Sequence, residues 1–186
     1  SKIIVNIDGN DWKRKKWGLL ARVFLKLSEK LAISYADVLV ADNKEIKNYI
    51  YHKYNVKSEL IAYGGDHVRF VKINSNLKDK YLFLSEKYIF KVCRIEPENN
   101  LDIILEVFAC SVSIPLVIVG NWSYSNYGVN LKERYQDIPH IYLLDPIYDQ
   151  CEIDVLRGNC YVYIHGHSVG GTNPSLVEAM SLGLAI

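Results

Sequence analysis

The stretch that decides the fold is CYVYIHGHSVGGTNPSLVEAMSL, residues 160–182. Its first part, residues 160–167, is a short apolar run of the kind that forms a buried strand. A glycine turn follows. The segment 174–182 predicts a helix, because Asn173 is a good N-cap and Pro174 a good first helical residue. A strand, a turn and a helix in this order are typical of a parallel α/β sheet.

The same alternation runs along the rest of the chain. Further strands are expected at 2–8, 37–42, 58–63, 88–95, 116–120 and 140–147. Further helices are expected at 12–36, 44–54, 97–108, 127–137 and 149–158. Strands separated by helices imply a parallel sheet with right-handed crossovers, so the predicted fold class is α/β.

The chain divides into two units of opposite charge. Residues 1–60 carry a net charge of +5 and residues 61–186 a net charge of −4. Between the two alternating patterns, residues 64–87 show weak periodicity and predict a linker with one helical turn. The whole chain has a net charge of only +1, which argues against a nucleic-acid-binding protein, because such a protein would be clearly basic.

Three coarser features complete the outline. The chain contains no run of 18 apolar residues, so no membrane span is expected. Cys93, Cys110, Cys151 and Cys160 form no C-x-x-C pair and predict buried free thiols in a reducing cytosol. The abrupt start at Ser1 and the apolar end at Ile186 suggest a fragment truncated at both ends.

The glycine turn before residue 174 is the first candidate site, because ligands of open parallel sheets bind beyond the carboxyl ends of the strands. Gly170 and Gly171 allow close backbone approach, and the amides of Ser175 and Leu176 begin a helix whose dipole suits a phosphate. Glu178, one turn later, can accept hydrogen bonds from vicinal sugar hydroxyls. The alternative is a well-capped helix in which Ser175 and Glu178 form a capping box.

Arg94 ends an expected strand at the same edge of the sheet. Its guanidinium can hold a diphosphate through paired hydrogen bonds. The alternative is a surface ion pair with Glu96 or Glu98. Gly120 follows the next strand, in another turn that faces the expected ligand.

Two other chemistries compete for the last turn. Residues 166–170 match G-x-S-x-G, the nucleophile elbow of serine hydrolases. Pro174 would break the helix that an elbow needs directly after Ser168, and no Asp or His follows to complete a triad. His165 and His167 could form a metal pair, but no Asp, Cys or Glu lies close to them in sequence.

Taken together, CRIEPENN (93–100), LVIVGN (116–121), LLDPIYD (143–149) and HSVGGTNPSLVEAMSLG (167–183) resemble the donor domain of GT-B glycosyltransferases of family 4. The resemblance is greatest to bacterial rhamnosyltransferase-like members, through NIDG-x-x-W-x-R-x-K-W and GGTNPSL-x-EAM. It implies that Arg94 and Asn99 bind the diphosphate of the sugar donor, and that Glu178 binds the ribose. Gly170 stands where this family has its other conserved glutamate.

The resemblance also assigns the parts of a truncated GT-B chain with Rossmann-like sheets. Residues 1–63 would end the acceptor-binding domain, 64–87 would be the linker, and 88–186 would be most of the donor domain. The donor-binding set would be Arg94, Asn99, Gly120, Gly170, Gly171, Thr172, Asn173, Ser175, Leu176 and Glu178. The catalytic histidine of such enzymes would lie before Ser1, and the fragment alone would be inactive.

The implied activity is that of a hexosyltransferase in cell-surface polysaccharide synthesis. It would transfer a sugar such as rhamnose from a dTDP-, UDP- or GDP-linked donor to a saccharide or lipid-linked acceptor. No cofactor or metal beyond the nucleotide sugar is expected, and the sequence has no D-x-D motif. The alternatives are a sugar-nucleotide epimerase of the same fold and a non-catalytic nucleotide- or sugar-binding module.

The first unit carries a basic amphipathic segment, residues 12–36, in which aromatic residues alternate with lysine and arginine. Such a helix can lie on an anionic membrane, which predicts a cytoplasmic protein at the inner face of the cell membrane. The alternative is an ordinary packed helix with a solvated basic side. Asp8, Gly9 and Trp12 follow an expected strand and are candidates for the acceptor cleft.

Overall fold

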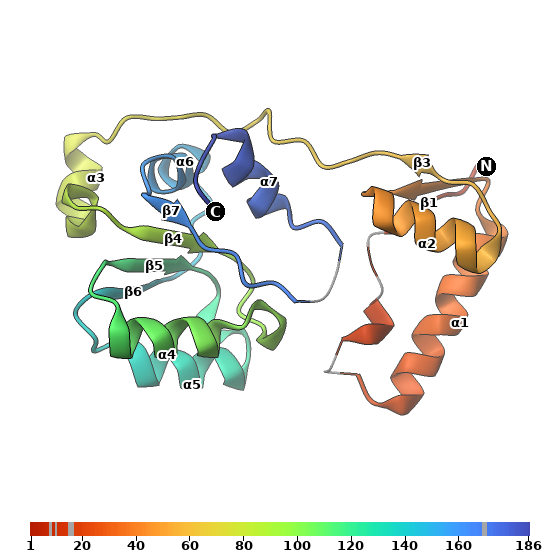
Figure 1. Ribbon diagram of the computed structural model, residues 1–186, viewed down its shortest axis with the longest axis horizontal. Helices are drawn as coiled ribbons and strands as arrows, with labels where there is room; N and C mark the ends of the chain where they lie inside the picture. The colour runs from red at the N-terminus through yellow and green to blue at the C-terminus, as the bar shows by residue number, and fades with distance from the viewer. Residues whose placement is uncertain (8, 10, 15–16, 169–170) are drawn as a thin grey trace. The chain divides into compact units, whose positions relative to one another are not determined.

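The computed structural model describes residues 1–7, 9, 11–14, 17–168 and 171–186. The chain forms two compact units, each with its own parallel sheet (Figure 1). Unit 1 contains residues 1–64 and the short segment 169–174. Unit 2 contains residues 65–168 and 175–186.

Unit 1 is a three-stranded parallel sheet in the order β1-β2-β3. The strands are β1 (Ile4–Ile7), β2 (Val38–Ala41) and β3 (Glu59–Leu60). The helical segments are η1 (Asp11–Lys13), α1 (Leu19–Tyr35) and α2 (Lys44–Tyr54). The core joins Ile7, Leu39 and Ala41 of the sheet to Ile33 of α1 and to Ile46 and Ile50 of α2.

The helix predicted over 12–36 is wrong at its start. A 3-10 turn at Asp11–Lys13 comes first, and α1 begins only at Leu19. Gly18 is its N-cap and has extended backbone angles of φ −69° and ψ 172°. The helix therefore cannot extend toward the N-terminus beyond Gly18, although the apolar spacing of the sequence continues across this residue.

Unit 2 is a four-stranded sheet in the order β6-β5-β4-β7, with all neighbours parallel. The strands are β4 (Ile89–Val92), β5 (Leu116–Val119), β6 (Ile141–Leu144) and β7 (Val162–Tyr163). The chain moves outward from β4 to β5 and β6, and then returns to place β7 on the other side of β4. That reversal makes the carboxyl end of β4 a topological switch point, where α/β sheets form ligand crevices.

Helices cover both faces of this sheet (Figure 1). They are α3 (Ser75–Lys80), η2 (Leu82–Ser85), η3 (Pro97–Asn99), α4 (Leu101–Ser111), η4 (Trp122–Tyr124), α5 (Asn126–Tyr135), α6 (Gln150–Gly158) and α7 (Pro174–Ser181). Strand β5 shows the two layers, because alternate side chains point to opposite faces. Leu116 and Ile118 pack with α4 and α5, whereas Val117 and Val119 pack with α6 and α7.

The structure of this unit differs from two of the predictions, because tertiary packing decides both features. The segment predicted as a linker contains α3 and η2, and Phe83 and Leu84 are buried in the core of unit 2. The helix predicted from residue 97 is interrupted at Asn100, whose φ of 50° lies in the left-handed region. Asn100 also donates from Nδ2 to the carbonyl of Gly166 at 2.7 Å, which ties this break to the loop after β7.

The cysteines agree only in part with the prediction. None of the four, all of which lie in the described ranges, forms a disulfide. Cys160 is buried and Cys93 is partly buried, but Cys110 and Cys151 are exposed, so the prediction of four buried thiols is wrong.

Among the described residues, no helix combines the length and apolar character needed to cross a bilayer.

Candidate functional site

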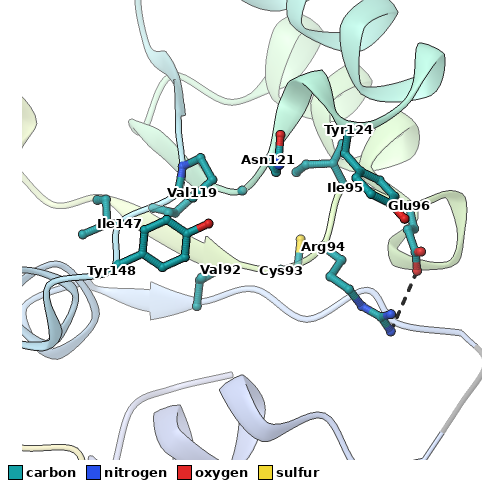
Figure 2. Close-up of a pocket in the computed structure, with 12 residues that line it drawn as sticks. Val92, Cys93, Arg94, Ile95, Glu96, Val119, Asn121, Tyr124, Ile147 and Tyr148 are labelled. Atoms are coloured by element: carbon teal, nitrogen blue, oxygen red, sulfur yellow. Dashed lines mark ion pairs between the residues drawn. The ribbon is translucent and has the colours of Figure 1, made fainter.

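A pocket of about 330 Å³ lies in unit 2, where β4, β5 and β6 end (Figure 2). Its walls come from the turns that follow these three strands. The lining residues are Val92, Cys93, Arg94, Ile95, Glu96, Val119, Gly120, Asn121, Tyr124, Pro146, Ile147 and Tyr148. The pocket therefore occupies the edge at which the sheet topology predicts a ligand.

Gly120 makes the close approach of two of these turns possible. A Cβ atom at this position would lie 2.5 Å from Cδ1 of Ile95 and 2.6 Å from the carbonyl oxygen of Cys93. The Gly120 amide donates to the carbonyl of Leu144 at 3.1 Å, which also ties the end of β5 to β6. Any side chain here would push the turn after β5 away from the end of β4.

Arg94 brings positive charge to the pocket from the end of β4. Its side chain is 68% exposed, and Nη2 lies 3.8 Å from Oε2 of Glu96, a loose ion pair. The ion pair predicted as the alternative therefore exists (Figure 2), but most of the Arg94 side chain remains exposed. Asn99, which is buried, donates from Nδ2 to the Arg94 carbonyl at 2.8 Å. Asn99 thus braces the backbone that carries Arg94.

Much of the remaining lining is apolar and aromatic. Tyr124 and Tyr148 are 74% and 91% exposed, and Figure 2 draws them at opposite ends of the pocket. Burial raises the pKa of Cys93 to about 11, so its thiol stays protonated at neutral pH. A planar, partly apolar ligand group fits this lining, and Arg94 can bind an attached anion.

The loop after β7 is bonded to the loop after β4 at the switch point. Ser168 donates to the Glu98 carbonyl from its amide at 2.9 Å and from its hydroxyl at 3.1 Å. His167 Nδ1 lies 3.3 Å from Oδ1 of Asn99. The Glu98 carboxylate is buried, and neither oxygen has a hydrogen-bond partner in the described part of the chain. Polar contacts therefore join the two loops next to the chain segment that carries Arg94.

The two histidines of that loop do not form a metal centre with other residues. Their ring centroids are 6.2 Å apart. Burial lowers the pKa of His165, and the nearby Lys91 and His167 lower it further, which favours a neutral ring. Within the described ranges, no group of three His, Cys, Asp or Glu side chains could hold a metal ion.

The glycine turn is described only in part. Gly170 lies outside the described residues, and the segment 171–174, which includes Gly171 and Asn173, clusters with unit 1. Within that unit the amide of Thr172 donates to Oδ2 of Asp42 at 2.8 Å, and its hydroxyl accepts from Asn43 Nδ2 at 3.2 Å. The Thr172 amide is therefore occupied by a carboxylate of the protein itself.

The start of α7 lies against the end of β4. The helix begins at Pro174 as predicted. The hydroxyl of Ser175 donates to the Val92 carbonyl at 3.0 Å, and Leu176 packs on the core. This contact joins the first turn of α7 to Val92, the last residue of β4, which lies two residues before Arg94 in the chain. None of the described residues 171–178 lines the pocket, however.

Glu178 belongs to a separate ionic cluster in unit 2. Its Oε2 lies 2.5 Å from Nη2 of Arg157, and its Oε1 lies 3.1 Å from Nε2 of His67. Arg157 is buried and also pairs with Asp154 at 3.2 Å. Both carboxylate oxygens of Glu178 thus have a partner within unit 2. Ser175 is the second residue of α7 and not its N-cap, so it does not occupy the position that a capping box requires.

The serine hydrolase alternative finds no support in this geometry. Strand β7 ends at Tyr163 and α7 begins at Pro174, so Ser168 does not sit on a sharp strand-to-helix turn. Its hydroxyl instead donates to the Glu98 carbonyl.

The predicted acceptor residues are described in part. Asp8 lies outside the described residues. Gly9 and Trp12 both line a second pocket, which lies in unit 1. Among the predicted sugar-donor residues, Arg94 and Gly120 share the pocket of unit 2. Tyr124 and Tyr148 were missed, although their positions in turns after strands could have drawn attention to them.

Comparison with known proteins adds two family matches. Residues 1–66 match a domain of unknown function (DUF1972), and residues 73–186 match the family described as Glycosyl transferases group 1. An uncharacterized glycosyltransferase of Methanocaldococcus jannaschii is 30% identical over 182 residues, which cover 90% of this chain and 44% of that protein. The chain therefore spans less than half the length of this curated relative.

Solved structures agree in fold. Anabaena HepE in complex with UDP-glucose has a TM-score of 0.72 at 16% identity and covers 98% of this chain and 52% of its own. S. aureus MnaA in complex with UDP has a TM-score of 0.63 at 13% identity, over 98% of this chain and 49% of its own. These likenesses confirm the predicted α/β fold of GT-B type.

Proposed function

We propose, since the chain belongs to the glycosyl transferases group 1 family, that unit 2 binds the nucleoside diphosphate of a sugar donor. The whole protein would then transfer that sugar to an acceptor. The observation that carries the proposal is the pocket at the ends of β4, β5 and β6, with Arg94 at its rim. Its volume lies at the lower end of the roughly 300–1,000 Å³ that is usual for small-molecule sites.

The base and the diphosphate of a nucleoside diphosphate each have a counterpart in this pocket. The aromatic ring of Tyr148 and the side chain of Ile147, at one end of the pocket, suit the base. The guanidinium of Arg94 suits the diphosphate, on which negative charge grows as the sugar leaves. Asn99 supports this role by fixing the Arg94 carbonyl. The first turn of α7, with Ser175 and Leu176, adds the positive end of a helix near the same strand end.

The donor nucleotide would be UDP, dTDP or GDP, and the transferred sugar a hexose such as rhamnose. Two of the solved structures similar in fold contain UDP or UDP-glucose, which favours UDP as the first nucleotide to test. The acceptor would be a saccharide or a lipid-linked saccharide in cell-surface polysaccharide synthesis. No metal or other cofactor is proposed beside the nucleotide sugar.

The test is a transfer assay with the full-length protein and UDP-, dTDP- and GDP-hexoses. We expect release of one nucleoside diphosphate that depends on Arg94, so that Arg94→Ala lowers the rate at least tenfold. Arg134→Ala, on the exposed side of α5, is the control and should retain activity. Binding of a nucleotide without any turnover would instead favour a binding module, the alternative suggested by the glycine at position 170.

Membrane contact belongs to the same proposal. The outward side of α1 carries large exposed apolar side chains, and basic residues flank it. Those side chains are Leu19, Leu20, Val23, Phe24, Leu27, Leu31 and Tyr35. Such a face beside lysine and arginine suits an anionic bilayer surface, and the protein would then lie at the inner face of the cell membrane.

Vesicle co-sedimentation tests this contact. The full-length protein should bind vesicles that contain phosphatidylglycerol more strongly than vesicles of phosphatidylcholine alone. Serine at Phe24 and Leu27 should abolish the difference. Leu82→Ser is the control, because Leu82 is 76% exposed in unit 2 and lies outside α1. Unchanged binding of the Phe24/Leu27 variant would refute the contact.

A further inference from the structure

The pocket of unit 2 holds a negative charge that a phosphate-binding site does not need. Of the described residues that line it, two carry a formal charge, Arg94 and Glu96. The Cys93 thiol is not a third, because burial raises its pKa to about 11 and keeps it protonated at neutral pH. The Glu96 carboxylate therefore offsets the positive charge that Arg94 brings to the ligand.

Glu96 is fixed in the turn after β4. Its amide donates to the Arg94 carbonyl at 3.0 Å, and its carbonyl accepts from the Asn99 amide at 3.0 Å. Glu96 is also the N-cap of η3, but its side chain makes no capping hydrogen bond there. That side chain is only 14% exposed. The carboxylate is therefore held at the pocket wall, beside the arginine that would bind the phosphates.

The ion pair with Glu96 leaves the Arg94 guanidinium able to bind a ligand. Nη2 of Arg94 and Oε2 of Glu96 are 3.8 Å apart, which is too long for a hydrogen bond (Figure 2). The N–H groups of Arg94 can therefore donate to a phosphate. A phosphate bound in this way would lie close to the Glu96 carboxylate, and solvent screens a partly buried charge less than an exposed one.

The charge of a phosphate depends on what is attached to it. The terminal phosphate of a free nucleoside diphosphate has a second pKa of about 6, so it carries nearly two negative charges at neutral pH. In a nucleotide sugar the same phosphate is esterified by the sugar and carries one negative charge. Arg94 alone would thus favour the free nucleotide, because that ligand has the extra charge. The carboxylate beside it cancels this advantage.

We propose that Glu96 sets the preference of the pocket for a nucleotide sugar over the free nucleoside diphosphate. This rests on the proposed function, in which the pocket binds the sugar donor. The free nucleotide is the product that remains after transfer, so a lower affinity for it limits product inhibition and favours binding of the next donor. Glu96 acts through its charge and takes no part in making or breaking bonds.

Calorimetric titration of the full-length protein tests this role with three ligand pairs: UDP and UDP-glucose, dTDP and dTDP-glucose, GDP and GDP-mannose. For the pair that binds, the Kd of the free nucleotide is divided by the Kd of the nucleotide sugar. We expect this ratio to fall about fivefold in Glu96→Gln and in Glu96→Ala, as the loss of one repelling charge at a partly exposed site requires.

Two further variants are the controls. Glu96→Asp keeps the negative charge and should keep the wild-type ratio. Glu106→Gln makes the same change of charge at an exposed position of α4, outside the pocket, and should also keep the wild-type ratio.

The ratio separates the effect of charge from an effect on structure. If Glu96 only positions Arg94, its removal weakens both ligands of a pair equally and the ratio does not change. A wild-type ratio in Glu96→Gln and Glu96→Ala, or an equal fall in Glu106→Gln, would overturn the role of Glu96 and leave the nucleotide site standing. If no pair binds the wild type, the proposed function fails and the role of Glu96 with it.

Discussion

At the scale of single residues, Gly120 decides whether the nucleotide pocket can form. Its missing side chain lets the turn after β5 touch the end of β4, next to Cys93 and Ile95. Arg94 then lies at the rim of the pocket, braced by Asn99. The chemistry proposed for unit 2 therefore depends on one residue without a side chain and one with a long cationic side chain.

Gly120→Ala should destabilise the protein and weaken nucleotide binding, because its Cβ would overlap backbone as well as side chain. The expected loss is about 1–3 kcal/mol of unfolding free energy, measured by urea denaturation. Gly18→Ala is the matched control, since a Cβ at Gly18 has no atom within 4 Å. Equal stability of the two variants would show that the turn can shift and that the pocket does not need a glycine.

At Glu178, the contacts in the structure differ from the role that the family resemblance implies. The resemblance assigns it to the ribose, but its carboxylate contacts Arg157 and His67. Glu178→Ala should therefore lower the free energy of unfolding by roughly 1–3 kcal/mol, because it removes one partner of the buried Arg157. Glu106→Ala, an exposed glutamate on α4, should have little effect. Urea denaturation of both variants would contradict the account if their stabilities were equal.

At the scale of elements, α3 and α6 are joined by an ionic contact on the surface of unit 2. Glu152 of α6 accepts hydrogen bonds from Lys80 Nζ at 2.7 Å and Tyr81 Oη at 2.6 Å. The bond from Lys80 first, and that from Tyr81 second, lower the pKa of Glu152. A carboxyl whose folded pKa is depressed stabilises the fold above its unfolded pKa and loses that contribution as the pH falls through the folded value.

The stability of the wild type should therefore fall more steeply between pH 6 and pH 3 than that of Glu152→Gln. Thermal unfolding at several pH values measures the difference. At pH 7 the variant should be the less stable protein, and the two melting curves should converge at low pH. Parallel pH profiles would show that the contact with Lys80 does not contribute.

The elements also show what sequence patterns could and could not predict. The expected helix at 44–54 has the bounds of α2, because Asn43 caps its start and Asn55, with a φ of 55°, ends it. The start of α1 was missed because the apolar spacing continues through Gly18. The roles of Phe83 and Leu84 were missed because burial in the core of unit 2 depends on tertiary packing, which has no local signal.

The candidate site was predictable to the same limited degree. Arg94 and Gly120 could be chosen because each follows an apolar strand. Tyr124 and Tyr148 line the same pocket because the turns after β5 and β6 lie at the same edge of the sheet, which no single stretch of sequence encodes. The occupation of the Thr172 amide by Asp42 joins residues 130 positions apart and could not be expected.

At the scale of the whole molecule, each unit has its own parallel sheet and its own pocket. The pocket of unit 2 lies where β4, β5 and β6 end, whereas that of unit 1 lies beside β1 and α1. The proposed nucleotide site is the pocket of unit 2, the position at which open parallel sheets bind ligands.

Hydrogen–deuterium exchange of the full-length protein tests this assignment of the nucleotide to unit 2. UDP should give its largest protection in residues 92–96, 119–124 and 146–148, which line the pocket of unit 2. Protection by UDP confined to unit 1 would reverse the assignment.

The most direct measurement is calorimetric titration of the full-length protein and its Arg94→Ala variant with UDP, dTDP and GDP. We expect one of the three to bind the wild type and its Kd to rise about 10- to 100-fold in the variant, as loss of a charge-assisted hydrogen bond of about 1.5–3 kcal/mol requires. Arg134→Ala should keep the wild-type Kd. A Kd for Arg94→Ala equal to that of the wild type, or no binding of any of the three nucleotides, would contradict the central claim.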